Sequence, residues 1–94
     1  MSSDRKHFVS EDGKIWIQVC CYDDRGDPYP PNNFRPELYP STVEYAGSSC
    51  YRVDEAWRRA HATAEKYGLK QTEAGKEAEA SSKEWAKENF KIEW

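Results

Sequence analysis

Two runs of β-forming residues flank an Asp12-Gly13 pair near the start of the chain. An Asp-Gly pair in this setting favours a two-residue type I′ hairpin, in which Glu11 faces Lys14. The same register places Phe8 opposite Ile17 and Val9 opposite Trp16. Because side chains alternate between the faces of a strand, the predicted core face carries Phe8, Ile15, Ile17, Val19 and Cys21. The other face carries Val9, Trp16, Cys20 and Tyr22, an unusually aromatic set for a surface in water.

Residues 23–41 contain all five prolines of the chain. Proline has no backbone N–H, so this composition excludes a helix and a central strand. It predicts a long ordered loop, attached to the core by Tyr29, Phe34, Leu38 and Tyr39. Residues 42–45 and 50–53 flank Gly47-Ser48-Ser49 and predict a second short hairpin.

The hydrophobic period becomes helical from residue 54 onward. A first helix is predicted over about 54–67, with Asp54 as its N-cap and Gly68 just past its end. Its apolar stripe consists of Val53, Trp57, Ala60, Ala64 and Tyr67, while its solvent side carries Arg58, Arg59, Thr63, Glu65 and Lys66.

A second helix is predicted over about 72–88, because this segment is rich in Ala, Glu and Lys and offers an i,i+4 pair of Glu79 and Lys83. Its apolar stripe is thin and consists of Ala74, Ala78, Trp85 and Ala86. Beyond it, Phe90, Ile92 and Trp94 alternate with charged residues and predict a short strand at the sheet edge.

Together these elements predict a single α+β domain over residues 1–94. A small antiparallel sheet, made of the N-terminal hairpin, the second short hairpin and the C-terminal edge strand, would pack against two α-helices. The chain is 37% hydrophobic and 14% aromatic, so its aromatic rings must supply most of the buried area.

The charge balance disfavours a nucleic-acid partner. Net charge is −3 and the sequence pI is about 5.4, whereas phosphate-binding proteins carry a basic excess. A partner protein with a basic surface suits an acidic chain better. The polar amino end predicts no signal peptide, and no apolar run predicts a membrane span. Three cysteines without regular spacing predict free thiols and a cytoplasmic location.

Candidate catalytic or metal-binding chemistry is sparse. Cys20, Cys21 and Cys50 with His7 and His61 offer the residue types of a Cys–His enzyme or a zinc site, but no supporting spacing. The acidic turn of Asp23, Asp24 and Asp27 lacks the alternating ligands of a calcium loop. Arg58 and Arg59 beside Trp57 offer contacts to a phosphate or base, although a solvated helix face explains them as well. We therefore expect no cofactor and no bound metal.

The aromatic surplus points instead to a protein-binding surface, because Tyr and Trp dominate interface hot spots. The predicted site combines aromatic anchors with acidic neighbours: Tyr22, Asp23, Asp24, Asp27, Tyr29, Phe34, Glu37 and Tyr39. The expected function is a non-enzymatic binding module that acts by steric occlusion. Small size and composition associate it with phage or mobile-element inhibitors of bacterial machinery, anti-CRISPR proteins included. A host structural or regulatory subunit, a Cys–His enzyme and a nucleic-acid binder are the alternatives, in that order.

Overall fold

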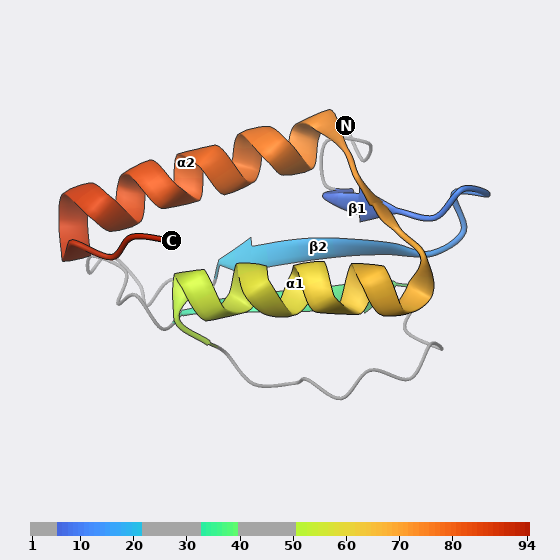
Figure 1. The fold of residues 1–94 in the computed structure, drawn as a ribbon, viewed down its shortest axis with the longest axis horizontal. Coiled ribbons are helices and arrows are strands. Elements are labelled where there is room, and N and C mark those ends of the chain that lie inside the picture. The colour runs from blue at the N-terminus through green and yellow to red at the C-terminus, as the bar shows by residue number, and fades with distance from the viewer. Residues whose placement is uncertain (1–5, 22–32, 40–50) are drawn as a thin grey trace.

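The computed structural model describes residues 6–21, 33–39 and 51–94 of the chain. Its elements follow in the order β1 (Phe8–Val9), β2 (Trp16–Cys21), β3 (Phe34–Tyr39), α1 (Val53–Tyr67), β4 (Lys70–Gln71) and α2 (Glu73–Phe90), as Figure 1 shows. The strands form one antiparallel sheet in the order β3-β2-β1-β4. The predicted α+β class, with an antiparallel sheet and two helices, is confirmed.

The register of the β1–β2 hairpin is as predicted, but its turn is not. Phe8 pairs with Ile17 and Val9 with Trp16. A type I′ turn needs positive φ at both central residues, and in this turn only Gly13 has it, with φ 75°. The Asp12 carboxylate instead accepts hydrogen bonds from the Ser10 hydroxyl (2.6 Å) and the Lys14 N–H (3.0 Å). These bonds stabilise a wider four-residue loop, closed where the Ser10 N–H donates to the Ile15 carbonyl at 2.8 Å.

Strand β3 corrects the prediction of an irregular loop over 23–41. Phe34 exchanges both of its backbone hydrogen bonds with Tyr51, on the side of β3 away from β2. Backbone groups alternate in direction along a strand, so Pro36, two residues on, also turns its nitrogen away from β2. The proline therefore removes no hydrogen bond from the β2–β3 ladder, and the strand forms at the sheet edge.

The predicted second hairpin is only partly within the described residues. Residues 42–45 and Cys50 lie outside them. Of the remainder, Tyr51 bridges to Phe34, and Val53 already belongs to α1.

Helix α1 begins one residue earlier than predicted, so the N-cap position falls on Arg52 and not on Asp54. Asp54 lies in the first turn, where its side chain is buried. The predicted end is confirmed, because Gly68 adopts a left-handed conformation with φ 73°. The predicted apolar stripe faces the core, with Val53, Trp57, Ala60 and Ala64 buried and Tyr67 half-buried.

Helix α2 confirms the second predicted helix but continues to Phe90. Its N-cap is Thr72, whose side chain accepts a hydrogen bond from the Gly75 N–H at 2.9 Å. Beyond it, the predicted C-terminal strand is wrong. Lys91 adopts a left-handed conformation, and the Ile92 N–H bonds back to the Ala86 carbonyl at 3.2 Å. The tail turns under the helix, where Ile92 and Trp94 pack against the core.

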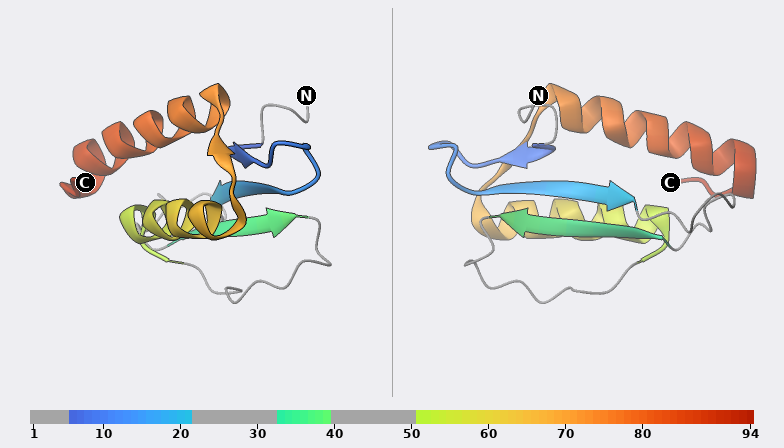
Figure 2. Two further views of the ribbon diagram at one scale, coloured as in Figure 1. Left: turned by 45° about the vertical axis from the view of Figure 1, so that its right-hand side comes forward. Right: turned by 180° about the vertical axis from the view of Figure 1, so that it is seen from behind.

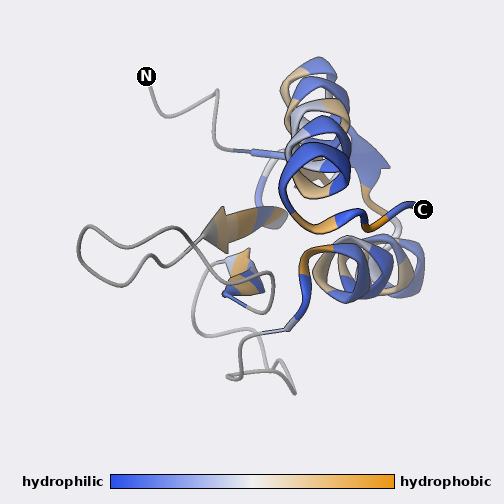
Figure 3. Ribbon diagram, turned by 90° about the vertical axis from the view of Figure 1, so that its left-hand side faces the viewer, coloured by the Kyte–Doolittle hydropathy of each residue, from blue (hydrophilic) through white to orange (hydrophobic). Residues whose placement is uncertain are grey.

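Both helices lie on the same side of the sheet, as the end-on view in Figure 3 shows. The core between them and the sheet contains Phe8, Ile17, Leu38, Trp57 and Ala86, each no more than 6% exposed. Neither of these two helices, the only ones among the described residues, has the long uncharged stretch that a bilayer span requires.

His7 joins the elements around this core. Its N–H donates to Ile17 and its Nδ1 accepts the Val19 N–H, which attaches it to β2 (2.9 and 3.0 Å). Its carbonyl accepts the Thr72 N–H at 2.9 Å, just before α2 begins. Its ring packs against Trp57 of α1, with 5.4 Å between ring centroids. Burial disfavours the imidazolium and lowers the pKa of His7, so the ring is neutral at pH 7.

Gly75 is the residue that lets α2 approach His7 so closely. A Cβ built at Gly75 would lie 2.1 Å from the His7 carbonyl oxygen, a backbone atom that cannot move aside cheaply. Helix propensity alone predicts that Gly75→Ala stabilises the protein by about 0.5–1 kcal/mol. We expect the opposite sign, a loss of about 2–3 kcal/mol in the free energy of unfolding, because the clash separates α2 from β1.

Urea denaturation measures this difference, with Gly68→Ala as the matched control. No atom lies within 4 Å of a Cβ at Gly68, so that variant carries only the left-handed backbone cost of about 1–2 kcal/mol. A Gly75→Ala protein as stable as the wild type would show that the close contact between α2 and His7 does not exist.

Candidate functional site

The face of the sheet that points away from both helices carries a cluster of polar and aromatic side chains. On β2 they alternate with buried Ile17 and Val19, and on β3 with buried Phe34, Pro36 and Leu38. We call this set the outer sheet face: Trp16, Gln18, Cys20, Arg35, Glu37 and Tyr39. Seen from behind in Figure 2, β2 and β3 lie in front of α1, so no helix of the described residues covers them.

Cross-strand contacts hold this face in one arrangement. The rings of Trp16 and Tyr39, which are paired across β2 and β3, stack with centroids 5.5 Å apart and planes 17° apart. The Lys6 ammonium lies 4.5 Å from the centre of the Trp16 ring. Such aromatic cross-strand pairs contribute about 0.2–1 kcal/mol each and restrict the rotamers of both side chains.

Glu37 is the polar centre of the outer sheet face. Its carboxylate accepts two hydrogen bonds from the Arg35 guanidinium, at 3.1 and 2.9 Å. It also accepts the Tyr39 hydroxyl at 2.5 Å and the Cys20 thiol at 3.5 Å. The Glu37 and Arg35 side chains are 21% and 28% exposed, so the ion pair is reachable from solvent yet partly shielded from it.

Three of the eight residues of the predicted binding site lie in the described part of the chain. Tyr22, Asp23, Asp24, Asp27 and Tyr29 lie outside the described residues. Glu37 and Tyr39 lie together on the outer sheet face. Phe34 points the other way and is 7% exposed, which agrees with its predicted attachment to the core and contradicts its place in the binding surface.

Arg35 belongs to this face but is not among the residues predicted from the sequence. The signal that could have revealed it is the alternation of apolar and polar residues over 34–39, which was outweighed by the proline content of the surrounding segment.

Phe34 is a core residue, so its truncation tests stability. Its ring lies 5.5 Å from that of Trp85 on α2 and joins the sheet to this helix. We expect Phe34→Ala to lower the free energy of unfolding by about 3–5 kcal/mol, the usual cost of removing a buried Phe side chain. Thermal denaturation followed by circular dichroism measures it. An unchanged melting temperature would place Phe34 on the surface after all.

The residues proposed for Cys–His chemistry already form hydrogen bonds with other groups. His7 accepts the Val19 N–H, and the Nε2 of His61 lies 2.9 Å from a carboxylate oxygen of Glu79. The Cys20 thiol donates a hydrogen bond to Glu37. The side chain of Cys21 and the whole of Cys50 lie outside the described part of the structure. Among the residues that are described, no three His, Cys, Asp or Glu side chains converge to hold a metal ion.

The His61–Glu79 contact joins α1 to α2 directly. Gln71 of β4 adds a second hydrogen bond to the same Glu79 oxygen, at 2.7 Å. Burial alone would raise the pKa of Glu79, but the hydrogen bonds from Gln71 and His61 outweigh it and lower the pKa. Glu79 thus pairs with neighbouring elements and not with Lys83, the partner predicted within its own helix. The Lys83 ammonium lies 5.9 Å from the ring centre of Trp94.

The arginines of α1 are matched by acids of the same segment. Asp54 receives two hydrogen bonds from Arg52, at 2.7 and 2.8 Å, and one from Arg58 at 3.2 Å. Arg59 donates to Glu55 at 2.9 Å. Arg58 and Arg59 thus form ion pairs within the helix, which favours the solvated helix face over a phosphate contact. The hydrogen bonds from Arg52 hold the pKa of Asp54 well below its usual range.

This ion pairing predicts a pH dependence. Because the pKa of Asp54 is lower in the folded state, its stabilising effect is full above the unfolded pKa of about 4 and is lost as pH falls below it. The Asp54 side chain is 5% exposed but both arginines are 56% exposed, so we expect Asp54→Asn to cost only about 1–2 kcal/mol at pH 7.

Urea denaturation of both proteins between pH 7 and pH 2 checks this expectation. The gap between wild type and Asp54→Asn should narrow steadily as the pH drops below about 4 towards the lower folded pKa. A gap of constant size across that range would mean that the cost comes from packing and not from charge.

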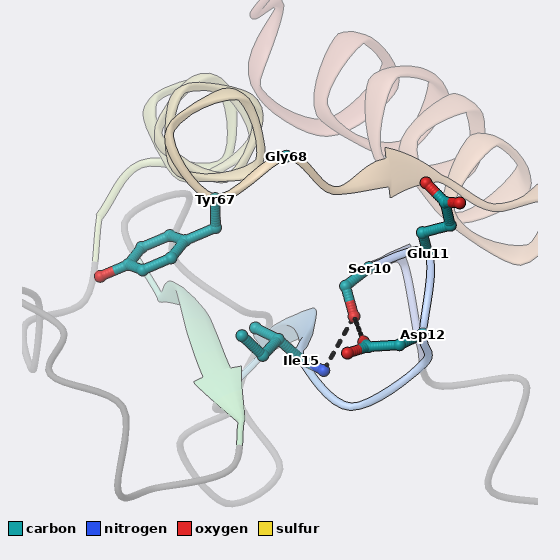
Figure 4. A pocket seen from close by; sticks show the side chains of 6 residues that line it. All are labelled: Ser10, Glu11, Asp12, Ile15, Tyr67 and Gly68. Carbon is teal, nitrogen blue, oxygen red and sulfur yellow. Dashed lines mark hydrogen bonds between the residues drawn. The ribbon is translucent and has the colours of Figure 1, made fainter.

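A shallow hollow of about 520 Å³ lies between the end of α1 and the β1–β2 turn (Figure 4). Its walls are the half-buried side chains of Ile15 and Tyr67, with Ser10, Glu11, Asp12 and Gly68 around them. Hydrogen bonds from Ser10 and the Lys14 backbone lower the pKa of Asp12, so its carboxylate is ionised at neutral pH. The hollow combines an apolar wall with one negatively charged side, where the Ser10 hydroxyl donates to the Asp12 carboxylate at 2.6 Å.

Comparison with known proteins gives no assignment: no family model, no curated protein and no solved structure matches this chain.

Proposed function

We propose that this protein is a non-enzymatic protein-binding module that acts by covering part of a partner's surface. The observation that supports the proposal is the outer sheet face, where a stacked Trp16–Tyr39 pair lies beside the Arg35–Glu37 ion pair. Trp, Tyr and Arg are the residue types enriched at interface hot spots. Their mutual contacts also fix their rotamers before binding, which lowers the entropy that association must overcome.

The distribution of charge favours a partner with a basic surface. Of the 14 basic and 17 acidic side chains, 12 of each lie in the described ranges, so the net charge of −3 belongs to the other segments. Three of those acids, Asp23, Asp24 and Asp27, lie in residues 22–32, which connect the end of β2 to the start of β3. With Arg25 they give residues 22–32 a net charge of −2, so two of the three excess negative charges are joined through the chain to the strands that carry the outer sheet face.

Inhibition by occlusion is the form of this proposal that suits a chain of 94 residues. A domain of this size offers about the area of one standard interface, roughly 800 Å² per partner. The more specific proposal, that the protein is an inhibitor encoded by a phage or mobile element, rests on size and composition alone.

Tyr39→Ala tests the proposal, with Tyr67→Ala as the matched control. Both tyrosines are half-buried, but Tyr67 lies at the end of α1, away from the outer sheet face. A partner retained from bacterial lysate is first identified and purified, and then its affinity for each variant is measured. We expect Tyr39→Ala to weaken binding by at least about 1 kcal/mol, roughly fivefold. Tyr67→Ala should change it less than twofold.

The melting temperature of each variant separates binding from stability. Tyr39→Ala that lowers the melting temperature but leaves affinity unchanged would reduce the outer sheet face to a structural role.

A paired Asp23→Ala and Asp24→Ala change should mainly slow association, and its effect should shrink in high salt because exposed charges are screened.

A further inference from the structure

Helix α2 carries a row of acidic residues on the side opposite its buried positions. Glu77, Ser81, Glu84 and Glu88 follow one another at spacings of three or four residues, so they share one face, which we call the acidic stripe. All four residues are exposed, whereas Gly75 and Ala86 are the buried positions of this helix.

The glutamates of the acidic stripe differ from Asp54 and Glu55 of α1 in having no counter-ion among the described residues. Asp54 and Glu55 on α1 pair with arginines. Across the described residues, by contrast, no hydrogen bond or ion pair involves the side chains of Glu77, Glu84 or Glu88. Glu84 and Glu88 are also an i,i+4 pair of like charge, an arrangement that destabilises a helix. Their repulsion is relieved when a cation from outside the chain approaches.

An aromatic ring lies beside these charges. Trp85 is half-buried and held between Phe34, with ring centroids 5.5 Å apart, and Phe90, with centroids 5.2 Å apart. A hollow of about 270 Å³ lies over it, lined by Ser81, Glu84, Trp85 and Glu88. The ring of Trp85 is therefore fixed in place, with a carboxylate before it and another after it along the helix.

These features fit the side chain of lysine or arginine. Its aliphatic stem can lie on the indole while its charged end reaches the carboxylates, because such side chains cover apolar surface and keep the charge in water. The indole face adds a cation–π attraction. A polyanion would meet Glu84 and Glu88 with like charge, which excludes nucleic acid from this face.

We infer that the acidic stripe and Trp85 form a docking surface for a lysine- or arginine-rich segment of a partner protein. The inference rests on the proposed function, protein binding, and adds a second contact on α2, separate from the outer sheet face. Glu84 and Glu88 are one helical turn apart, about 6 Å along the axis, so two basic side chains at that spacing would engage both.

The test uses a defined probe, a 15-residue helical peptide of alanine and lysine, with a glutamine-for-lysine version as the uncharged control. Binding is followed at low salt through the backbone amide signals of the ¹⁵N-labelled full-length protein. We expect the shifts to concentrate at residues 77–88 and at the Trp85 indole. The glutamine peptide should produce none.

Two double variants with the same change in net charge decide whether the site is specific. Glu84→Gln with Glu88→Gln should weaken binding of the lysine peptide at least fivefold. Glu65→Gln with Glu93→Gln, at exposed positions on α1 and in the tail, should weaken it less than twofold. Equal loss in both double variants, or shifts spread over the whole surface, would overturn the inference as attraction to net charge alone.

Affinity measurements with the partner identified for the outer sheet face distinguish a failure of this inference from a failure of the proposed function. If Tyr39→Ala weakens that complex and the Glu84→Gln, Glu88→Gln variant does not, the inference fails while the proposed function stands. If neither variant affects the complex, both fail.

Discussion

The contact between the His7 carbonyl and the first turn of α2 determines how the rest of the molecule is assembled. The carbonyl accepts the Thr72 N–H at 2.9 Å, and Gly75 approaches it closely enough that a methyl group would not fit. At the same residue, the imidazole accepts the Val19 N–H of β2 in a buried hydrogen bond. An unsatisfied buried N–H costs about 1–3 kcal/mol, so the bond to Val19 stabilises the sheet while the bond to Thr72 holds the helix.

This junction lies on the side of the sheet that both helices cover, and the opposite side is the one on which the proposed binding depends. The aromatic and polar side chains of β2 and β3 alternate with the buried ones and so point away from the helices, and the residues of the acidic stripe of α2 are exposed. The two helices also differ electrostatically. Asp54 and Glu55 of α1 pair with Arg52, Arg58 and Arg59, whereas Glu84 and Glu88 of α2 have no partner among the described residues. Helix α1 therefore presents a balanced surface, and α2 an acidic one.

Local sequence signals predicted those elements whose formation depends on neighbouring residues. The Asp12-Gly13 pair located the hairpin and the register of Phe8 with Ile17, although the turn type differs, and the Gly68 stop and the alanine-rich stripe located α1. The signals failed where a local preference met a tertiary contact. Pro36 disfavours a strand in general, but at an edge its nitrogen faces away from β2 and costs nothing. The alternating tail favours a strand, yet β3 and β4 already occupy the two edges of the sheet, and Ile92 bonds back to α2.

The candidate site divides in the same way. Composition alone showed an aromatic surplus and an acidic net charge, because both are sums over the chain that folding does not change. The binding surface is a proposal that starts from these two sums. Which residues form that surface was decided by the fold. Phe34 and Tyr39 belong to one strand and look equally suited to binding in the sequence, but an odd spacing places them on opposite faces of the sheet. Likewise, the sequence determined how many charges the chain carries, and only the tertiary structure decided which are paired, because pairing depends on distances of a few ångströms between side chains on different turns and elements.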